Sequence, residues 1–112
     1  MKTVIHISSN NSDKIAEAVA NARNLLQDPT VEDPEIAILL NADAVKAARK
    51  DSAAEKYFQE LLDKEVQIKA CNNSLESREI KEKELLQRVE AVPSGIGELT
   101  KLQTDGYAYI RP

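Results

Sequence analysis

The sequence contains one cysteine, Cys71, and a cysteine thiolate is a nucleophile. Apolar and polar residues alternate over 66–70, VQIKA, with the period of a β-strand. The next three residues, Asn72, Asn73 and Ser74, have short polar side chains that favour the start of a helix. We therefore expect Cys71 at a junction between a strand and a helix, where free backbone N–H groups favour a thiolate over a thiol.

The pattern predicts Asn73 as the N-cap of this helix. Glu76 lies three residues later, the spacing at which a carboxylate reaches back to the cap N–H in a capping box. A second interpretation stays open, because free cysteine is also among the most buried residue types and Cys71 could simply fill the core. With no second cysteine there is no CxxC pair, which excludes a thioredoxin-type dithiol centre.

A second candidate feature is the turn formed by Ser94, Gly95, Ile96 and Gly97. A glycine-rich turn before a helix can bind an anion with its backbone N–H groups. This one matches neither GxGxxG nor GxxxxGK[ST], so a tight turn with Ser94 as N-cap is the preferred interpretation.

The only histidine is His6, in the first predicted strand. A protein metal site needs three or four ligands, and neither a second histidine nor a pair of carboxylates stands out, so we expect no metal. We interpret His6 as a hydrogen-bonded core or interface residue in preference to a general base. Tyr107 and Tyr109 share one face of the last strand; one is expected to pack under a helix, and the other could pack or lie at an interface.

These residues must be positioned by alternating strands and helices. Strands are predicted over 3–8, 36–40, 66–71, 89–92 and 107–110. Helices are predicted over 13–27, from 43 to about 49, from Ser52 with Glu55 in a capping box, after Glu76, and from Ser94 to a left-handed cap at Gly106. This order predicts an α/β domain with a mostly parallel sheet covered by helices on both faces.

In such a sheet, chemistry collects at the carboxyl ends of the strands. The loops there are residues 8–12, 41–43, 71–74 and 93–97, so Cys71 lies on the functional edge. The buried helix faces are predicted from apolar spacing: Tyr57, Phe58, Leu61 and Leu62 in one helix, and Ile96, Leu99 and Leu102 in the last.

Composition limits the function classes. A chain of 112 residues with 42% hydrophobic and 30% charged residues forms one domain with a modest core. The net charge of −4 and the lack of a basic cluster disfavour nucleic-acid binding. We expect a cytoplasmic protein without membrane segments. The chain has a lone cysteine, no signal-peptide pattern after MKTVIHIS and no apolar run that could span a bilayer.

The sequence resembles the DsrE/DsrF-like (DsrEFH superfamily) sulfur-relay proteins over its whole length. The resemblance is carried by ACNNSL after an alternating strand, by PSGIGEL…GYAYI near the end, and by the opening MKTVIHISSN with the helix that contains NARNLL. It implies a single DsrE-like domain, residues 1–112, folded as a three-layer α/β/α sandwich with a five-stranded parallel sheet and assembled as trimers or hexamers.

The resemblance also implies a function. Active relatives hold sulfane sulfur as a persulfide on the cysteine after the third strand, which maps to Cys71, and pass it to a partner thiol without a metal or organic cofactor. The sequence departs from the family where glycines are common: Glu65, Glu79 and the loop Asn41-Ala42-Asp43.

Two functions follow. The first is a sulfur carrier with sulfurtransferase activity, in which Cys71 is catalytic and a sulfur donor or acceptor protein is the partner; it requires that Cys71 be less than fully buried. The second is a non-enzymatic oligomeric module that binds a small ligand or a protein. The residues expected to form the binding site are Asn41, Asn72, Asn73, Ser74, Ser94, Gly95 and Gly97.

Overall fold

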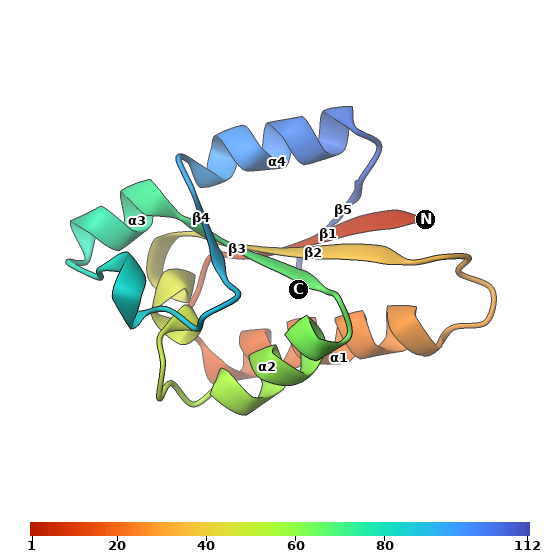
Figure 1. Ribbon diagram of the computed structural model, residues 1–112. Coiled ribbons are helices and arrows are strands. Elements are labelled where there is room, and N and C mark those ends of the chain that lie inside the picture. The colour runs from red at the N-terminus through yellow and green to blue at the C-terminus, as the bar shows by residue number, and fades with distance from the viewer.

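A computed structural model describes residues 1–112 as a five-stranded sheet with helices on both faces (Figure 1). The strand order is β4-β3-β2-β1-β5, and all four strand pairs are parallel. Along the chain the elements are β1 (Lys2–Ile7), α1 (Ser12–Gln27), β2 (Glu35–Leu40), the 3-10 helix η1 (Ala42–Ala48), α2 (Glu55–Asp63), β3 (Gln67–Cys71), α3 (Asn72–Ser77), the 3-10 turn η2 (Glu82–Glu84), β4 (Glu90–Val92), α4 (Gly95–Thr104) and β5 (Ala108–Ile110). The predicted α/β class, the parallel five-stranded sheet and the predicted order of elements along the chain are confirmed.

The handedness of the crossovers explains which helix covers which face. From β1 to β4 the chain moves across the sheet in one direction, with α1 and α2 on the same face (Figure 1). The last crossover runs back past three strands to place β5 beside β1. Because parallel crossovers are right-handed, this reversal puts α4 on the opposite face. The result is the three-layer sandwich that the sequence predicts.

The two faces have cores of different size. The cluster under α1 and α2 contains 25 buried apolar residues, whereas the cluster under α4 contains seven. Polar side chains are buried on the α4 side: His6 is 6% exposed and Lys69 is 8% exposed. Lys69 lies 2.5 Å from the Glu98 carboxylate, so a nearly buried ion pair joins β3 to α4. The thinner layer is therefore held partly by polar contacts, and it is the layer that carries the site.

Local sequence explains how α1 and α4 begin. The Asn11 side chain accepts hydrogen bonds from two backbone N–H groups of the first turn of α1, and Ser94 accepts one from Gly97 N–H at the start of α4. Gly106, at φ +93°, ends α4 in the left-handed conformation that glycine adopts freely. The predicted cap at Ser94 and the predicted C-terminal glycine are both confirmed.

Three expectations about the helices are wrong. Helix α2 begins at Glu55 rather than at Ser52, whose hydroxyl donates to the Ala47 carbonyl and so binds the preceding segment instead of a helix end. Tyr57 is 49% exposed, because its ring lies beside the Arg23 guanidinium on the outer surface. Ile96 is 71% exposed, because Gly95, Leu99 and Leu102 form the buried side of α4.

The departures from glycine coincide with unusual backbone. Ala42, Glu65 and Glu79 have φ values of 50°, 67° and 55°, all in the left-handed region that favours glycine. The family resemblance leads us to expect glycine at Glu65 and Glu79, and Ala42 lies in the loop 41–43 that replaces a glycine-containing loop of the family. The fold therefore keeps a glycine-type backbone with residues that have a Cβ.

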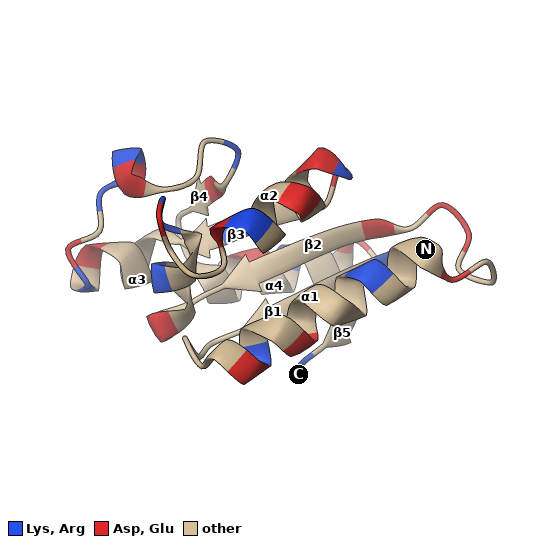
Figure 2. Ribbon diagram, turned by 90° about the horizontal axis from the view of Figure 1, so that it is seen from below, with Lys and Arg blue, Asp and Glu red and all other residues tan.

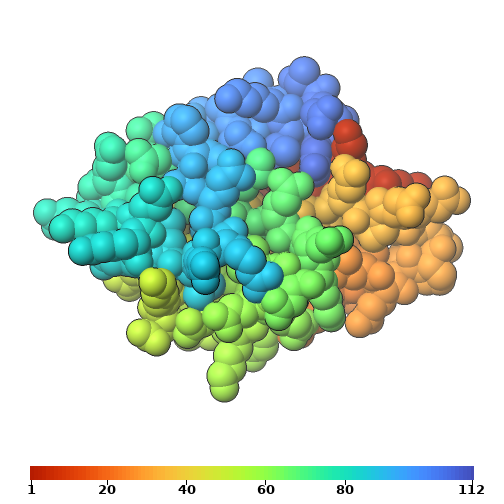
Figure 3. Space-filling model, in the orientation of Figure 1, coloured from red at the N-terminus to blue at the C-terminus, as the bar shows by residue number.

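The outer surface is polar. Acidic and basic residues are interspersed over the helices and loops and do not gather in one patch (Figure 2). In the space-filling view the cyan segment before β4 covers one edge of the molecule, between α4 above and the green α2 region below (Figure 3). No helix has both the length and the apolar character needed to cross a membrane.

Candidate functional site

Cys71 is the last residue of β3 and the N-cap of α3. The alternation read from the sequence places Ile68 and Ala70 in the core under α2, and so turns Lys69 and Cys71 to the α4 face. Cys71 keeps an extended backbone, with φ −66° and ψ 116°, and the helix starts at the next residue. The strand-to-helix junction predicted around Cys71 is confirmed.

The predicted cap at Asn73 is wrong. Helix α3 begins at Asn72, two residues earlier than a cap at Asn73 allows, because Cys71 itself supplies the extended residue before the first turn. The Glu76 carboxylate accepts a hydrogen bond from Asn72 Nδ2 at 3.0 Å instead of completing a capping box. Asn73 thus contributes its backbone N–H, and not its side chain, to the surroundings of Cys71.

The surroundings of the Cys71 thiol favour its ionised form. Burial raises the pKa, since only 6% of the residue is exposed. Hydrogen bonds from the Ser74 hydroxyl and from the backbone N–H groups of Ser74, Gly95 and Asn73 lower it by more, so that the pKa of Cys71 lies below its usual 9.0. Four donors around one sulfur therefore outweigh the cost of removing it from water.

The Ser74 hydroxyl is fixed as a donor to this sulfur. The backbone N–H of Ala42 donates to Ser74 Oγ over 2.8 Å, which leaves the hydroxyl hydrogen for Cys71. The side chains of Arg78 and Asp43, 2.9 Å apart, join α3 to η1 next to this contact. Ala42, whose backbone is left-handed, therefore presents its N–H group to Ser74 Oγ.

Gly95 brings the start of α4 against Cys71. A Cβ at Gly95 would lie 3.2 Å from the Cys71 Cβ and 3.1 Å from the Asn41 Cβ, which is closer than real Cβ atoms normally approach. A side chain here would push its neighbours apart by a few tenths of an ångström, whereas glycine allows the start of α4 to lie directly against Cys71. Ser94 and Gly97 act one step away, because Gly97 N–H donates to Ser94 Oγ over 2.8 Å and closes the first turn of α4.

The sequence-predicted site residues divide into two groups. Asn41, Asn73, Ser74 and Gly95 all lie around Cys71, by side chain or backbone. Asn72, Ser94 and Gly97 instead support the first turns of α3 and α4. The pattern around Cys71 is thus built from the carboxyl ends of β2, β3 and β4.

One residue of the site was not identified as such from the sequence. His6 is hydrogen-bonded and buried, as predicted, but its partners connect it to this edge: Nε2 lies 2.8 Å from Asn41 Oδ1, and Nδ1 lies 2.6 Å from the Tyr109 hydroxyl. The two tyrosines differ, since Tyr107 is 8% exposed and packs in the α4 core while Tyr109 is 40% exposed. The alternation of side chains along each strand is the signal that could have identified His6, because residues on the same face of neighbouring parallel strands lie side by side.

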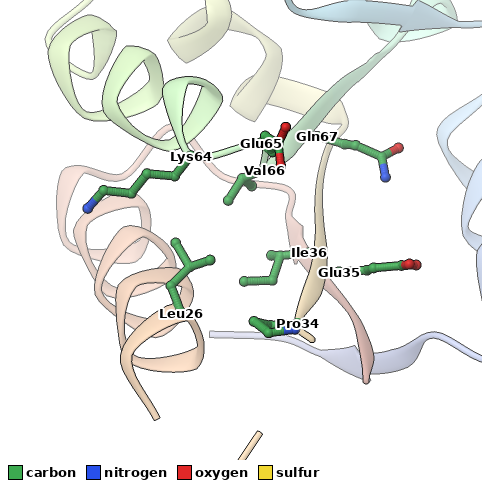
Figure 4. Close-up of a pocket in the computed structure, with 8 residues that line it drawn as sticks. All are labelled: Leu26, Pro34, Glu35, Ile36, Lys64, Glu65, Val66 and Gln67. Atoms are coloured by element: carbon green, nitrogen blue, oxygen red, sulfur yellow. The ribbon is translucent and has the colours of Figure 1, made fainter. Parts of the chain in front are cut away.

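A pocket of about 140 Å³ lies at the opposite edge of the sheet (Figure 4). It is lined by the first residues of β2 and by the turn before β3, with Leu26 pointing toward it from α1. None of the residues around Cys71 contributes to it. No group of three or more His, Cys, Asp or Glu side chains is close enough to hold a metal ion.

Solved structures share this fold. A protein of unknown function from Methanobacterium thermoautotrophicum, MTH1491, superposes with a TM-score of 0.94 and 32% sequence identity, over 99% of this chain and 98% of the other. The ychN protein from E. coli gives a TM-score of 0.82 at 16% identity over 100% of both chains. A conserved protein of unknown function from Bacteroides thetaiotaomicron, BT1422, gives 0.79 at 19% identity over 99% of this chain and 94% of the other. At these lower identities the last two show the fold alone.

No curated protein sequence matches the chain. The sequence pattern of the DsrE/DsrF-like family matches residues 1–112, which is the whole chain. Together with the five-stranded parallel sheet and the cysteine at the end of β3, this match shows that the chain belongs to the DsrE/DsrF-like family.

Proposed function

We propose that this chain is a sulfur carrier, with Cys71 holding sulfane sulfur as a persulfide and passing it to a partner thiol. Membership of a family associated with sulfur relay supports the class of reaction. The observation that carries the proposal is the position of Cys71 at the end of β3, with the start of α4 packed against it at Gly95, in surroundings that lower the pKa of its thiol.

Sulfur transfer through Cys71 has two balanced steps. In the first, the Cys71 thiolate attacks the outer sulfur of a donor persulfide; an S–S bond forms to Cys71, the donor S–S bond breaks, and the donor leaves as a thiolate. In the second, an acceptor thiolate attacks the outer sulfur on Cys71, and the Cys71 thiolate leaves. One sulfane sulfur atom moves, and no external oxidant or reductant is consumed.

The hydrogen-bond donors around Cys71 assist both steps. They increase the thiolate fraction near neutral pH, which favours loading. A thiol with a lower pKa is also a better leaving group, which favours release to the acceptor. Electrostatic stabilisation of the same sulfur thus serves attack and departure, and no metal or organic cofactor is needed.

The limited exposure of Cys71 also suits a carrier. Cys71 is buried, with 6% of the residue exposed, so its thiol is shielded from bulk solvent. A persulfide adds an outer sulfur about 2 Å beyond Sγ, and this is the atom that an acceptor must reach. A recessed thiol with an extended outer sulfur restricts access to a small nucleophile or to a partner that docks at this edge.

The donor and acceptor would be proteins or small molecules that carry a reactive thiol. We also propose that the chain forms a homo-oligomer, trimer or hexamer, in the cytoplasm. Ile96 at 71% exposure, with Tyr109 and Ile110 at 40% and 41%, supplies apolar surface for such contacts. Light scattering coupled to size-exclusion chromatography would measure the assembly, and a monomer at micromolar concentration would contradict this part of the proposal.

The direct test of the carrier function is sulfur loading followed by release. Wild type and Cys71→Ala are incubated with inorganic polysulfide, desalted and then given a small thiol such as dithiothreitol. We expect release of sulfide in proportion to loaded wild-type protein and none from the variant. Equal release from both proteins, or loading that cannot be discharged by any thiol, would contradict the proposal and favour a binding module.

A further inference from the structure

Four side chains form a row across the carboxyl edge of the sheet on its α4 face. They are Tyr109 of β5, His6 of β1, Asn41 after β2 and Cys71 of β3. The register explains the row, because Leu40 pairs with Ala70 and the next residues, Asn41 and Cys71, are therefore neighbours on parallel strands. The contact of both with Gly95 confirms that their Cβ atoms lie side by side.

The hydrogen bonds in this row have a defined direction. Asn41 Oδ1 only accepts, so the His6 Nε2 that lies 2.8 Å away carries the hydrogen. In the neutral ring Nδ1 is then the acceptor, and the Tyr109 hydroxyl donates to it over 2.6 Å. The row therefore runs from the tyrosine hydroxyl, through the imidazole, to the carbonyl of the Asn41 amide.

This direction determines which way the Asn41 amide faces. Its oxygen is used by His6, and its Nδ2 group has no hydrogen-bond partner in the chain. No buried polar side-chain atom is left without a partner, so Nδ2 remains accessible to solvent or to a ligand. Asn41 Nδ2 is therefore a free hydrogen-bond donor on the residue that follows β2, next to Cys71.

We propose, on the basis of the sulfur-carrier function above, that Asn41 Nδ2 donates a hydrogen bond to the sulfur group carried on Cys71, and that His6 and Tyr109 are positioning residues that orient this amide. The outer sulfur of a persulfide is anionic near neutral pH and lies about 2 Å from the Sγ atom that the other donors stabilise. Asn41 supplies a donor from a second strand. A hydrogen bond to an ionised sulfur is stronger than one to a neutral thiol.

The charged side chains on the surrounding elements are already paired and do not replace this donor. Lys69 on β3 contacts Glu98 of α4 and lies 3.9 Å from Glu90 of β4. Asp43 of η1 is bound by Arg78. Glu76 on α3 accepts from Asn72. The effect of His6 on Cys71 is therefore expected to pass through Asn41.

The test compares persulfide formation from inorganic polysulfide and the pH dependence of Cys71 alkylation by iodoacetamide. Asn41→Leu removes the amide at similar volume, and His6→Leu removes the group that orients it. We expect each to slow persulfide formation about tenfold, the effect of one charge-assisted hydrogen bond, and to leave the alkylation midpoint of the unloaded thiol unchanged, because Asn41 is not among the donors to Sγ.

Two further variants separate positioning from packing. His6→Gln retains a side-chain N–H for Asn41 Oδ1, so we expect it to restore most of the wild-type rate. Tyr109→Phe removes only a hydroxyl from a residue that is 40% exposed, so it folds normally, and we expect a smaller slowing of about threefold, within the range of a neutral hydrogen bond. Tyr57→Phe, on the outer surface of α2, is the matched control and should leave the rate unchanged.

The outcomes are distinct. If folded Asn41→Leu and Tyr109→Phe proteins match wild type in the rate of persulfide formation, or if His6→Gln is as slow as His6→Leu, the positioning role is overturned. If His6→Leu does not fold, Asn41→Leu and Tyr109→Phe still decide the question. Failure of wild type to form any persulfide would overturn the proposed function, and the positioning role of the row with it.

Discussion

Replacing Ser74 with alanine removes the side-chain donor that lies closest to the chemistry of Cys71. In the folded chain the Ser74 hydroxyl accepts from the Ala42 N–H over 2.8 Å and donates to the Cys71 sulfur. Ser74→Ala therefore removes one of four donors to the sulfur. It also leaves the Ala42 N–H without its acceptor, at a residue whose φ is 50°.

The expected magnitude follows from these two contacts. A hydrogen bond to an ionised group contributes about 1.5–3 kcal/mol, and one pKa unit corresponds to about 1.4 kcal/mol. Because the three backbone donors remain, we expect the pKa of Cys71 to rise by about one unit. The unpaired N–H of Ala42 should lower the free energy of unfolding by about 1–2 kcal/mol.

The assay is the second-order rate of Cys71 alkylation by iodoacetamide as a function of pH. Only the thiolate reacts, so a higher pKa moves the rising part of the profile to higher pH and slows the reaction at neutral pH. Ser77→Ala is the matched control, because Ser77 belongs to the same helix, is exposed, and donates to the Ser74 carbonyl over 3.1 Å without contacting the thiol. If the two variants have the same midpoint as wild type, the Ser74 hydroxyl does not stabilise the thiolate, and our reading of the site is refuted.

Three further predictions concern the scaffold. Lys69→Met should lower the free energy of unfolding by about 3 kcal/mol, because it leaves the nearly buried Glu98 carboxylate unpaired. The double variant Lys69→Met/Glu98→Leu should recover most of this loss. Urea denaturation measures both free energies, and equal stability of the single and double variants would contradict the prediction. Glu65→Gly and Glu79→Gly should each raise the free energy of unfolding by about 0.5–1 kcal/mol, because glycine adopts the left-handed backbone at these positions without strain. A decrease in either variant would show that the glutamate side chain stabilises the fold by more than the strain costs. Because the pKa of Cys71 is lowered on folding, its thiolate stabilises the fold fully above the unfolded pKa, and this contribution is lost as the pH falls through the folded pKa. The stability of wild type relative to Cys71→Ser should therefore rise with pH between those two values, and a difference that stays flat would contradict the lowered pKa.

The sequence predicted those features that depend on local pattern. The alternation over 66–70 located β3 and brought Cys71 to its end, and Ser94 identified the start of α4. The cap at Asn73 was predicted wrongly, because a capping box is recognised from residue types three positions apart. Those types do not reveal that Cys71 already has the extended backbone of a cap residue.

Features that depend on tertiary register were beyond a single sequence. His6 and Cys71 are 65 positions apart, and only the pairing of β1 with β2 and of β2 with β3 brings Asn41 between them. Ile96 was predicted to point inward from its helical spacing, but Gly95, four residues before Leu99, has an equally suitable spacing and is the residue that the structure buries. The family resemblance supplied what local pattern lacked, including the glycine positions that the structure shows in left-handed backbone.

The most direct test of the carrier function is the intact mass of the protein after incubation with inorganic polysulfide, for wild type and Cys71→Ala in parallel. We predict an adduct with the mass of added sulfur on wild type alone, and we predict that reductant removes it completely. A wild-type protein that gains no sulfur, while its folded thiol also reacts slowly with small alkylating reagents, would contradict the account and leave Cys71 as a packing residue.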